Sequence, residues 1–487
     1  MNPPAPELTL DPADWTELRT LGHRMLDDLF DYLMHVRERP VWQPMPGAAR
    51  ARLAEPVPRT PQPLAAVYEQ FARDVLPYPL GNIHPRFWGW VIGTGTPQGM
   101  LADMLAAGMN TQAAGVQEAG RHVEEQTLAW LAELLGFPRG SSGLFVSGGS
   151  MANLVALAVA RQAKAGFAVR DTGLHGSPAP LTVYASTEVH SSVRKAVELM
   201  GIGTANLKLI PVDREYRIVV PELAAAIARD RAAGARPIAV VGTAGTVNTG
   251  ATDDLAALAA VCRQEGLWFH VDGAFGALVA LAPELKPILA GLEQADSVAF
   301  DLHKWGYLPF EVGCTLVRHP DVHRDTFAVA PSYLGATARG PAAGGVLFAD
   351  LGVQLSRGFR ALKVWMALKT HGTDLIGRLI AQNVAQARYL ADLVDRHPRL
   401  ERLAPAPLNI VCFRFVVPGQ DDAALNALNQ EILWRIQETG VALPSHTMLG
   451  GRFAIRVAIT NHRSRREDFA ALVQAVMDVG TAVLEGR

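Results

Sequence analysis

The chain is poor in cysteine. Its 487 residues include three, Cys262, Cys314 and Cys412, which stand far apart and form no CxxC pair. Disulfide frameworks and structural zinc sites need more numerous or more closely spaced cysteines. The sequence therefore argues against both and favours a reducing, cytoplasmic setting.

The sequence also lacks a long apolar run and an excess of either charge. No stretch reaches the roughly 20 uncharged apolar residues of a membrane span. The N-terminal segment MNPPAPELTLDPADW has neither the basic start nor the apolar core of a signal peptide. With 45 basic and 47 acidic side chains the formal net charge is −2, which gives no electrostatic reason to expect a nucleic acid or a membrane surface as partner.

The N-terminal residues 1–80 predict a helical arm. Apolar side chains recur at helical spacing over residues 12–39, with Asp11-Pro12 as the expected cap, and a second short helix is expected over residues 64–75. Prolines crowd the connector between them. We expect such an arm to wrap a partner subunit.

Residues 81–370 predict a large α/β domain, because helices and strands alternate along them. Such alternation is typical of a mostly parallel sheet covered by helices, with ligands beyond the carboxyl ends of the strands. Strands are expected at 144–146, 181–185, 238–242, 268–271 and 297–300. Residues 371–487 predict a small C-terminal α/β domain, and the glycine- and alanine-rich residues 334–346 predict a mobile loop.

The first chemical signal is the sequence Asp301-Leu-His303-Lys304-Trp305, which follows an apolar strand-like run. A lysine in such surroundings is expected to be partly buried, and a partly buried amine is a usable nucleophile toward an aldehyde. A surface lysine in a loop would leave the same pattern.

The second signal is His270-Val-Asp272-Gly-Ala274, which also follows a strand. A carboxylate at a strand end, flanked by small residues, can approach a flat heteroaromatic ring and pair with its nitrogen. A helix cap is the structural alternative for Asp272.

Two further signals lie earlier in the chain. Ser147-Gly148-Gly149-Ser150 joins a strand to a helix, so free backbone N–H groups and the helix dipole form a natural phosphate site there. The segment has neither the lysine of GxxxxGK[ST] nor the spacing of GxGxxG. His190 follows another strand and has the shape to stack on a cofactor ring. Taken alone, a tight turn and a structural histidine explain both.

The four segments occur together in the order SGGSMAN, HSSV, HVDGAFG and DLHKW, and this set resembles the group II pyridoxal 5'-phosphate (PLP)-dependent amino-acid decarboxylases. The family includes aromatic-L-amino-acid decarboxylase and glutamate decarboxylase. The segments that begin at His84, Arg357 and Asn461 agree with it as well, so that the resemblance spans about residues 65–470.

The resemblance implies a PLP-dependent transferase-like fold of type I, a homodimer with the site at the subunit interface, and PLP as cofactor. Lys304 would carry PLP as a Schiff base, Asp272 would pair with the ring nitrogen and His190 would cover the ring face. The remaining cofactor contacts implied are Gly149, Ser150, His303, Thr246 and Ala274. Tyr333, on a loop of the neighbouring subunit, would return a proton to the substrate after loss of CO2.

The implied reaction is decarboxylation of an L-amino acid to its amine. Substrate contacts are expected from Trp90, Gln112 and Arg456. We favour an aromatic substrate, because Trp90 and Phe87 offer ring surface and no second cationic group is evident. Decarboxylation of an acidic or other amino acid, an aldehyde synthase and a carbon–carbon lyase remain alternatives, and a PLP-binding protein without catalysis is a more remote one.

A metal enzyme is disfavoured by the sequence. His319 and His323 are four residues apart, but Pro320 and nearby charges indicate an exposed turn, and no carboxylate completes a ligand set.

Overall fold

The computed structural model describes residues 7–329, 339–340, 343 and 347–486. Tyr333 and most of the segment 334–346 lie outside the described residues.

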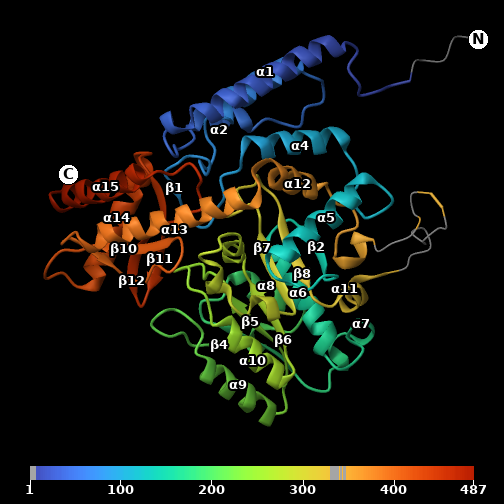
Figure 1. Cartoon of the computed structure of the whole chain (residues 1–487). Coiled ribbons are helices and arrows are strands. Elements are labelled where there is room, and N and C mark those ends of the chain that lie inside the picture. Colours follow the sequence, from blue (N-terminus) through green and yellow to red (C-terminus); the bar gives the residue numbers. More distant parts are fainter. Residues whose placement is uncertain (1–6, 330–338, 341–342, 344–346, 487) are drawn as a thin grey trace, which may run out of the picture.

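A mostly parallel sheet forms the centre of the molecule (Figure 1). Its strand order is β2-β8-β7-β6-β5-β3-β4. Among these described strands, β8 alone is antiparallel to the other six. The strands are β2 (Ser142–Val146), β3 (Leu181–Ser186), β4 (Leu207–Ile210), β5 (Arg236–Thr243), β6 (Trp268–Asp272), β7 (Ser297–Asp301) and β8 (Gly313–Val317). The five strands expected from the sequence are confirmed, as is the α/β class. β4 and β8 were not expected.

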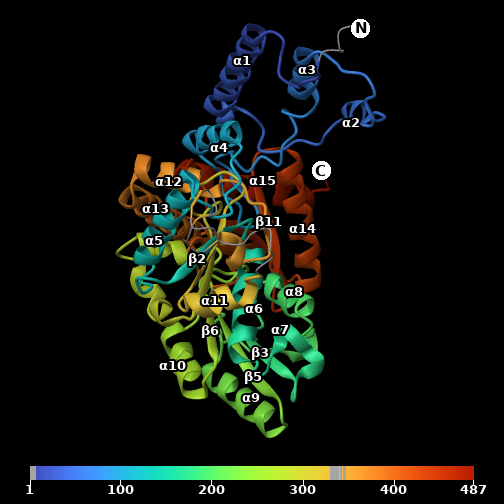
Figure 2. The ribbon, with the colours of Figure 1, turned by 90° about the vertical axis from the view of Figure 1, so that its right-hand side faces the viewer.

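Helices cover both faces of this sheet (Figure 2). Along β3 and β5, alternate buried side chains pack toward opposite faces, as strand geometry requires. The helices α6 (Gly149–Lys164) and α8 (Ser191–Leu199) cover one face, and α9 (Val220–Ala232) and α10 (Leu255–Glu265) cover the other. Both faces are therefore apolar, which explains the near-continuous hydrophobic runs of these strands.

A second sheet belongs to the C-terminal part of the chain. Its order is β1-β11-β12-β10-β9. The strands are β1 (Phe87–Trp88), β9 (Leu400–Arg402), β10 (Ile410–Phe415), β11 (Leu443–Leu449) and β12 (Arg452–Ala458), and the packed helices are α13 (Thr373–Asp395), α14 (Asp422–Glu438) and α15 (Arg466–Leu484).

The two-residue strand β1 joins this second sheet although the sequence assigned it to residues 81–370. It pairs in parallel with β11, so that Phe87 lies opposite Leu443. A pairing between such distant segments has no local signature in the sequence, and for the same reason β9 and β11 were not expected. The domain limits 80/81 and 370/371 remain a prediction.

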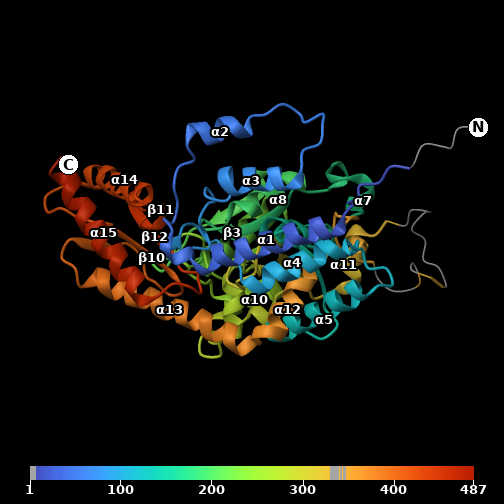
Figure 3. The ribbon, with the colours of Figure 1, turned by 90° about the horizontal axis from the view of Figure 1, so that it is seen from above.

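The N-terminal arm stands above the body (Figures 2 and 3). Of the 20 described residues of α1 (Trp15–Met34), none is buried. Asp14 caps this helix by accepting a 2.7 Å hydrogen bond from the Thr16 N–H, so the cap expected at Asp11-Pro12 is wrong. The helix expected over residues 64–75 is confirmed as α3 (Leu64–Asp74).

The other helices connect these parts. They are α2 (Gly47–Leu53), α4 (Pro97–Met109), α5 (Ala119–Leu134), α7 (Val169–Thr172), α11 (Pro320–Phe327) and α12 (Arg360–His371), with short 3-10 turns such as η8 (Phe348–Leu351). No helix in the described part of the chain is long and apolar enough to cross a membrane.

A buried ion pair ties α5 to β2 and to the segment before α12. Arg357 Nη2 lies 2.5 Å from Glu124 Oε1, and both side chains are 1% exposed. The same guanidinium donates to the carbonyls of Ala113 and Phe145 at 2.7 and 2.9 Å. Burial raises the pKa of Glu124, and the charge of Arg357 opposes that rise.

We expect Arg357→Met to lower the free energy of unfolding by about 3–5 kcal/mol, because it leaves a buried carboxylate without its partner. Chemical and thermal unfolding of the full chain measure the change. Arg231→Met is the matched control, because it breaks an ion pair with Glu265 in which the arginine side chain is 46% exposed and the glutamate side chain 24% exposed. This substitution should lower the free energy of unfolding by less than about 1 kcal/mol. Equal losses in the two variants would contradict the structural role of Arg357.

Candidate active site

The candidate site lies where strands of the large sheet end. β2, β6 and β7 run in the same direction, so their carboxyl ends, at Val146, Asp272 and Asp301, meet at one edge of the sheet. A cavity of about 390 Å³ opens there. Its lining includes residues from all four sequence signals, namely Gly149, Ser150, His190, Ala274, His303 and Lys304.

Lys304 lies in this cavity and not in a surface loop. Its Nζ is 2.8 Å from Asp301 Oδ2, and the lysine side chain is 21% exposed whereas the aspartate is 2% exposed. The other oxygen, Asp301 Oδ1, is buried and has no hydrogen-bond partner among the described residues. The ion pair therefore holds the amine at a fixed point beside the end of β7.

The glycine turn after β2 forms a narrow cradle. A Cβ atom on Gly149 would lie 2.8 Å from Asp301 Oδ2, and one on Gly148 would lie 3.3 Å from His303 Cε1. The 16-residue helix α6 begins at Gly149, and its N-terminus carries a partial positive charge and free N–H groups. This arrangement suits an anionic group such as a phosphate.

Asp272 is buried at the end of β6. Its Oδ2 accepts a 3.0 Å hydrogen bond from Asn153 Nδ2, and its Oδ1 accepts one of 3.1 Å from the Ala274 N–H. The carboxylate thus keeps lone pairs for a further donor. It does not cap a helix, so the structural alternative considered for it is wrong.

His190 is the N-cap of α8 and faces the cavity. Its Nδ1 accepts a hydrogen bond of 3.2 Å from the Ser192 N–H and lies 2.8 Å from Ser192 Oγ. Burial lowers the pKa of His190, and the carboxylate of Asp272 opposes this effect.

His303 is buried beside Lys304. Its Nδ1 lies 3.1 Å from the Val312 nitrogen, and its ring centre is 4.5 Å from that of Phe310. Burial lowers the pKa of this histidine too. Because the ring lies against Gly148, it borders the same cradle.

Five of the expected residues that the structure describes, Asp272 and four others, do not line the cavity. Thr246 is buried in a turn where its Oγ1 accepts from the Ala251 N–H at 3.1 Å. Gln112 donates to the Leu355 carbonyl at 3.1 Å. The other two, Trp90 and Arg456, lie together at a separate place.

Arg456 is buried and fully engaged by protein acceptors. Its Nη1 donates to the Trp90 carbonyl at 3.0 Å and its Nε donates to the Asn248 carbonyl at 3.1 Å, with further bonds to Val247 and Ser445. Trp90 is 52% exposed and has a left-handed backbone, with φ 51°. In this structure Arg456 therefore positions Trp90, and a contact of Arg456 with substrate remains a prediction.

Sequence reasoning missed several residues of the site. Asp301, Phe310 and Glu311 line the cavity, as do Asn153 and Ser192. Asp301 had a usable signal, because it precedes Lys304 by three residues. Asn153 follows Gly149 by one helical turn, a spacing that places both on one face of α6.

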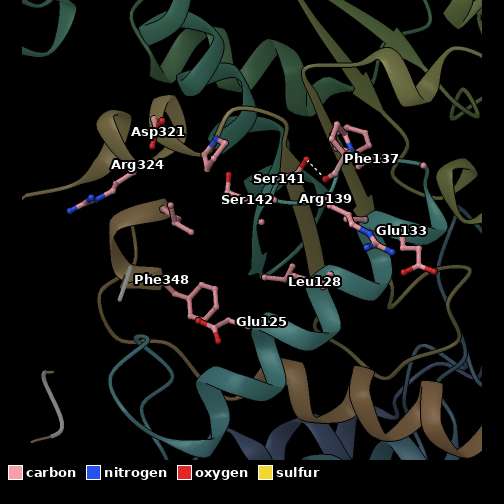
Figure 4. Close-up of a pocket in the computed structure, with 18 residues that line it drawn as sticks. Glu125, Leu128, Glu133, Phe137, Arg139, Ser141, Ser142, Asp321, Arg324 and Phe348 are labelled. Carbon is pink, nitrogen blue, oxygen red and sulfur yellow. Dashed lines mark hydrogen bonds between the residues drawn. The ribbon is translucent and has the colours of Figure 1, made fainter. Parts of the chain in front are cut away.

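A larger hollow lies elsewhere, between α5, the turn 136–143 and α11 (Figure 4). Its volume is about 650 Å³, and it shares no lining residue with the cavity at Lys304. On α11 nearby, His323 is buried, with Nδ1 2.7 Å from Ser142 Oγ and Nε2 2.8 Å from the Leu351 carbonyl. The exposed turn expected at His319 and His323 is thus wrong for His323.

The cavity fits PLP by its chemistry. Its lining offers an amine for an aldehyde and a glycine cradle at a helix N-terminus for a phosphate. Directly behind the lining residues Asn153 and Ala274, the buried carboxylate of Asp272 has spare lone pairs for a ring nitrogen. The groups stand on different strands of one sheet edge, so one flat ligand can meet all three.

Comparisons with known proteins agree with this chemistry. The pyridoxal-dependent decarboxylase conserved domain matches residues 46–416. Aromatic-L-amino-acid decarboxylase of Bacillus atrophaeus is 34% identical over 465 residues, which cover 94% of this chain and 95% of that protein. Tryptophan decarboxylase 2 of Oryza sativa subsp. japonica is 29% identical and covers 98% of this chain and 97% of its own length.

Solved structures give the same result. The crystal structure of Oryza sativa TDC with PLP and tryptamine has a TM-score of 0.90 at 28% identity, covering 98% of this chain and all of that one. The structure of mouse CSAD has a TM-score of 0.90 at 25% identity, covering 96% of this chain and 99% of that one. These relatives confirm fold type I and PLP as cofactor, and the chain belongs to the pyridoxal-dependent decarboxylase family.

Proposed function

We propose that this protein removes the carboxyl group of an aromatic L-amino acid, with PLP held on Lys304. The observation that carries the proposal is the Lys304 amine, fixed 2.8 Å from Asp301 in a cavity that also presents His190 and the glycine turn. The named relatives, which include tryptophan and tyrosine decarboxylases, support the substrate class.

Bound PLP supplies an aldehyde that joins to amines and a protonated pyridine ring that accepts the electron pair left when CO2 departs. The chain's own groups prepare this chemistry. Asp272 would offer its free lone pairs to the ring N–H and would keep that proton on the ring nitrogen. The N-terminus of α6, with Gly149 and Ser150, would hold the phosphate, and His303 borders it. Thr246 and Ala274 would pack against the ring.

Two residues are proposed to handle the substrate beside the ring. His190 would cover one ring face, because it lines the cavity at the N-terminus of α8. Tyr333 would return a proton to the substrate Cα. This residue lies outside the described part of the chain, so its role rests on the family resemblance alone.

The charges around the cavity favour an aromatic over an acidic substrate. Among the described residues that line it, Lys304 is the sole lysine or arginine, and Glu311 adds a carboxylate. An acidic side chain would therefore meet no second cation among these residues. Trp90 would supply ring surface, since Arg456 and Ser445 hold its backbone while the indole stays half exposed.

A homodimer is the second part of the proposal. The arm and the neighbouring α4 expose many large apolar side chains, namely Leu64, Val67, Phe71, Val75, Met104, Leu105 and Met109. A helix arm with so little buried surface gains its stability by covering another molecule. A second copy of the chain is the partner that the family resemblance implies.

We also infer a cytoplasmic location. The three cysteine thiols are free and buried. A reducing compartment preserves such thiols.

Incubation of the PLP-loaded protein with single amino acids, followed by mass spectrometry, tests the reaction. We expect amine and CO2 from phenylalanine, tyrosine or tryptophan analogues, and no product from Lys304→Ala, which lacks the amine. Trp90→Ala should raise KM for the aromatic substrate more than it lowers kcat, because it removes contact surface. Formation of an amine from glutamate alone would contradict the aromatic assignment. Formation of an aldehyde with hydrogen peroxide would indicate the aldehyde-synthase alternative. A 29% identical relative, phenylacetaldehyde synthase of Arabidopsis thaliana, carries that activity in its name.

Gly93→Ala should lower kcat/KM by about a hundredfold, because even a small displacement of reacting groups is costly. A Cβ there would lie 2.0 Å from the His303 carbonyl oxygen and 2.4 Å from that of Lys304, so the lysine segment must shift. Gly108→Ala is the control. That glycine lies in α4 with open space around it, and the change should leave turnover intact while stabilising the helix by up to about 1 kcal/mol. Normal turnover in Gly93→Ala would show that Lys304 need not be held this tightly.

The dimer is tested by sedimentation velocity of the full chain. Phe71→Asp should raise the dimer dissociation constant at least about tenfold, because the interface would bury an unpaired charge. Trp434→Asp changes an exposed aromatic residue on α14 in the C-terminal part and serves as the control. Equal dimer dissociation constants in the two variants would show that the interface lies away from the arm.

A further inference from the structure

A continuous chain of buried polar side chains runs behind Asp272. At its far end the Trp268 Nε1–H donates to Ser297 Oγ at 2.8 Å, and Ser297 Oγ lies 2.9 Å from His270 Nδ1. On the other side of the imidazole, Nε2 lies 2.8 Å from Asn153 Oδ1. All four side chains are buried on strands β6 and β7 and helix α6.

Asn153 divides this chain into two branches. Its Nδ2 donates to Asp272 Oδ2 at 3.0 Å and to Ser192 Oγ at 2.9 Å. Ser192 Oγ in turn lies 2.8 Å from His190 Nδ1. One buried amide therefore touches the residue proposed for the ring nitrogen and, through one hydroxyl, the residue proposed for the ring face.

The chemistry of the groups fixes the direction of every hydrogen bond from Trp268 to Asp272. An indole N–H can only donate, so Ser297 Oγ accepts from Trp268 and keeps its single hydrogen for His270 Nδ1. The proton of His270 then sits on Nε2 and points at Asn153 Oδ1. From the opposite end, the carboxylate of Asp272 can only accept, which turns the Asn153 nitrogen toward it and the oxygen toward His270. The carboxylate end fixes the assignment, and the indole end agrees with it.

The branch to His190 is fixed in the same way. The Ser192 N–H donates a long hydrogen bond of 3.2 Å to His190 Nδ1, whereas the shorter contact at Nδ1 is the one of 2.8 Å with Ser192 Oγ, whose direction depends on Asn153. Ser192 Oγ accepts from Asn153 and has its own hydrogen left to give to Nδ1. The ring proton of His190 is therefore on Nε2, and the imidazole offers the cavity a donor and not a lone pair.

Both histidines are neutral in this arrangement. Burial lowers the pKa of His270 to about 4, with the charge of Asp272 opposing. Burial also lowers the pKa of His190; the charges around it are Asp272 and Asp301, which raise it, and Lys304 and Lys195, which lower it. A neutral imidazole has one proton, so its place on Nδ1 or Nε2 decides what the ring can do.

We propose that Asn153 is a positioning residue that holds the carboxylate of Asp272 and, through Ser192, keeps His190 in its Nε2–H tautomer. The proposal rests on the proposed function, because that function assigns Asp272 to the PLP ring nitrogen and His190 to the ring face. The expected tautomers of His190 and His270 do not require bound cofactor. Because the O–H and the N–H of Ser192 share the single lone pair of Nδ1, His190 is left to donate a hydrogen bond from Nε2 toward a bound carboxylate or carbanion. It cannot act as the base.

The tautomers are measured directly in the full-length protein labelled with ¹⁵N-histidine. Long-range ¹H–¹⁵N correlation spectra distinguish protonated from unprotonated ring nitrogens, and His190→Gln and His270→Gln assign the two signals. We expect a single Nε2–H form for both rings at neutral pH, without and with PLP. An Nδ1–H form or an even mixture at His190 in the wild type would overturn the proposal without any variant of Asn153.

Asn153→Ala tests the link between the two branches. The loss of its N–H groups should give a mixed tautomer signal at His190 and weaken PLP binding at least about tenfold, because a buried carboxylate loses a donor. PLP affinity is measured by equilibrium titration of the cofactor-free protein, independently of turnover. Asn429→Ala is the matched control, since that amide is also buried and makes three hydrogen bonds, to Phe415 and Leu425, in the C-terminal part.

The control separates positioning from general stability. Both variants are expected to unfold at a lower temperature than the wild type, whereas the His190 signal and the PLP affinity should change in Asn153→Ala alone. Unchanged tautomer and affinity in a folded Asn153→Ala protein would refute the role, as would equal changes in Asn429→Ala. If no amino acid is decarboxylated while the tautomers and PLP binding behave as described, the proposed function fails and this inference stands.

Discussion

Parallel pairing of β3, β5, β6 and β7 is the constraint on which the site depends. Parallel strands end at the same edge, so residues that follow β2, β3, β6 and β7 meet although more than a hundred positions separate some of them. The buried faces of the sheet hold this edge rigid, since helices cover both of them. A ligand that bridges Lys304, Asp272 and the turn at Gly149 thus meets groups whose spacing the sheet sets.

Buried charge is tolerated at this edge because each charge has partners. Asp301 holds Lys304, while Asp272 receives N–H groups from Asn153 and Ala274. A buried carboxylate without such donors would cost several kcal/mol, roughly the effective penalty for an ion in a protein interior. The same requirement explains the polar chain behind Asp272: each acceptor in it needs a donor, and the series ends at Trp268, which can only donate.

The proposed substrate contacts are held differently from the proposed cofactor contacts. Trp90 follows β1, which belongs to the second sheet, and Arg456 on β12 holds its carbonyl together with that of Asn248. Gly93 then brings the same segment against the backbone of His303 and Lys304. The proposed substrate contact at Trp90 and the proposed cofactor contact at Lys304 are therefore joined by short contacts between the segment after β1 and the segment after β7, and not by a shared strand.

The sequence by itself determined the α/β class, five of the seven strands of the large sheet, and the four segments that meet at the cavity, because local periodicity and strand-end motifs carry that information. It did not determine that β1 joins the second sheet, that Arg456 is engaged by carbonyls, or that Asn153 links Asp272 to His190. Those features are contacts between segments far apart in the chain, such as Phe87 with Leu443 or Asn153 with His270. Only the packed tertiary structure decided them, since hydrogen-bond partners across such separations depend on which elements lie side by side and leave no periodic signal.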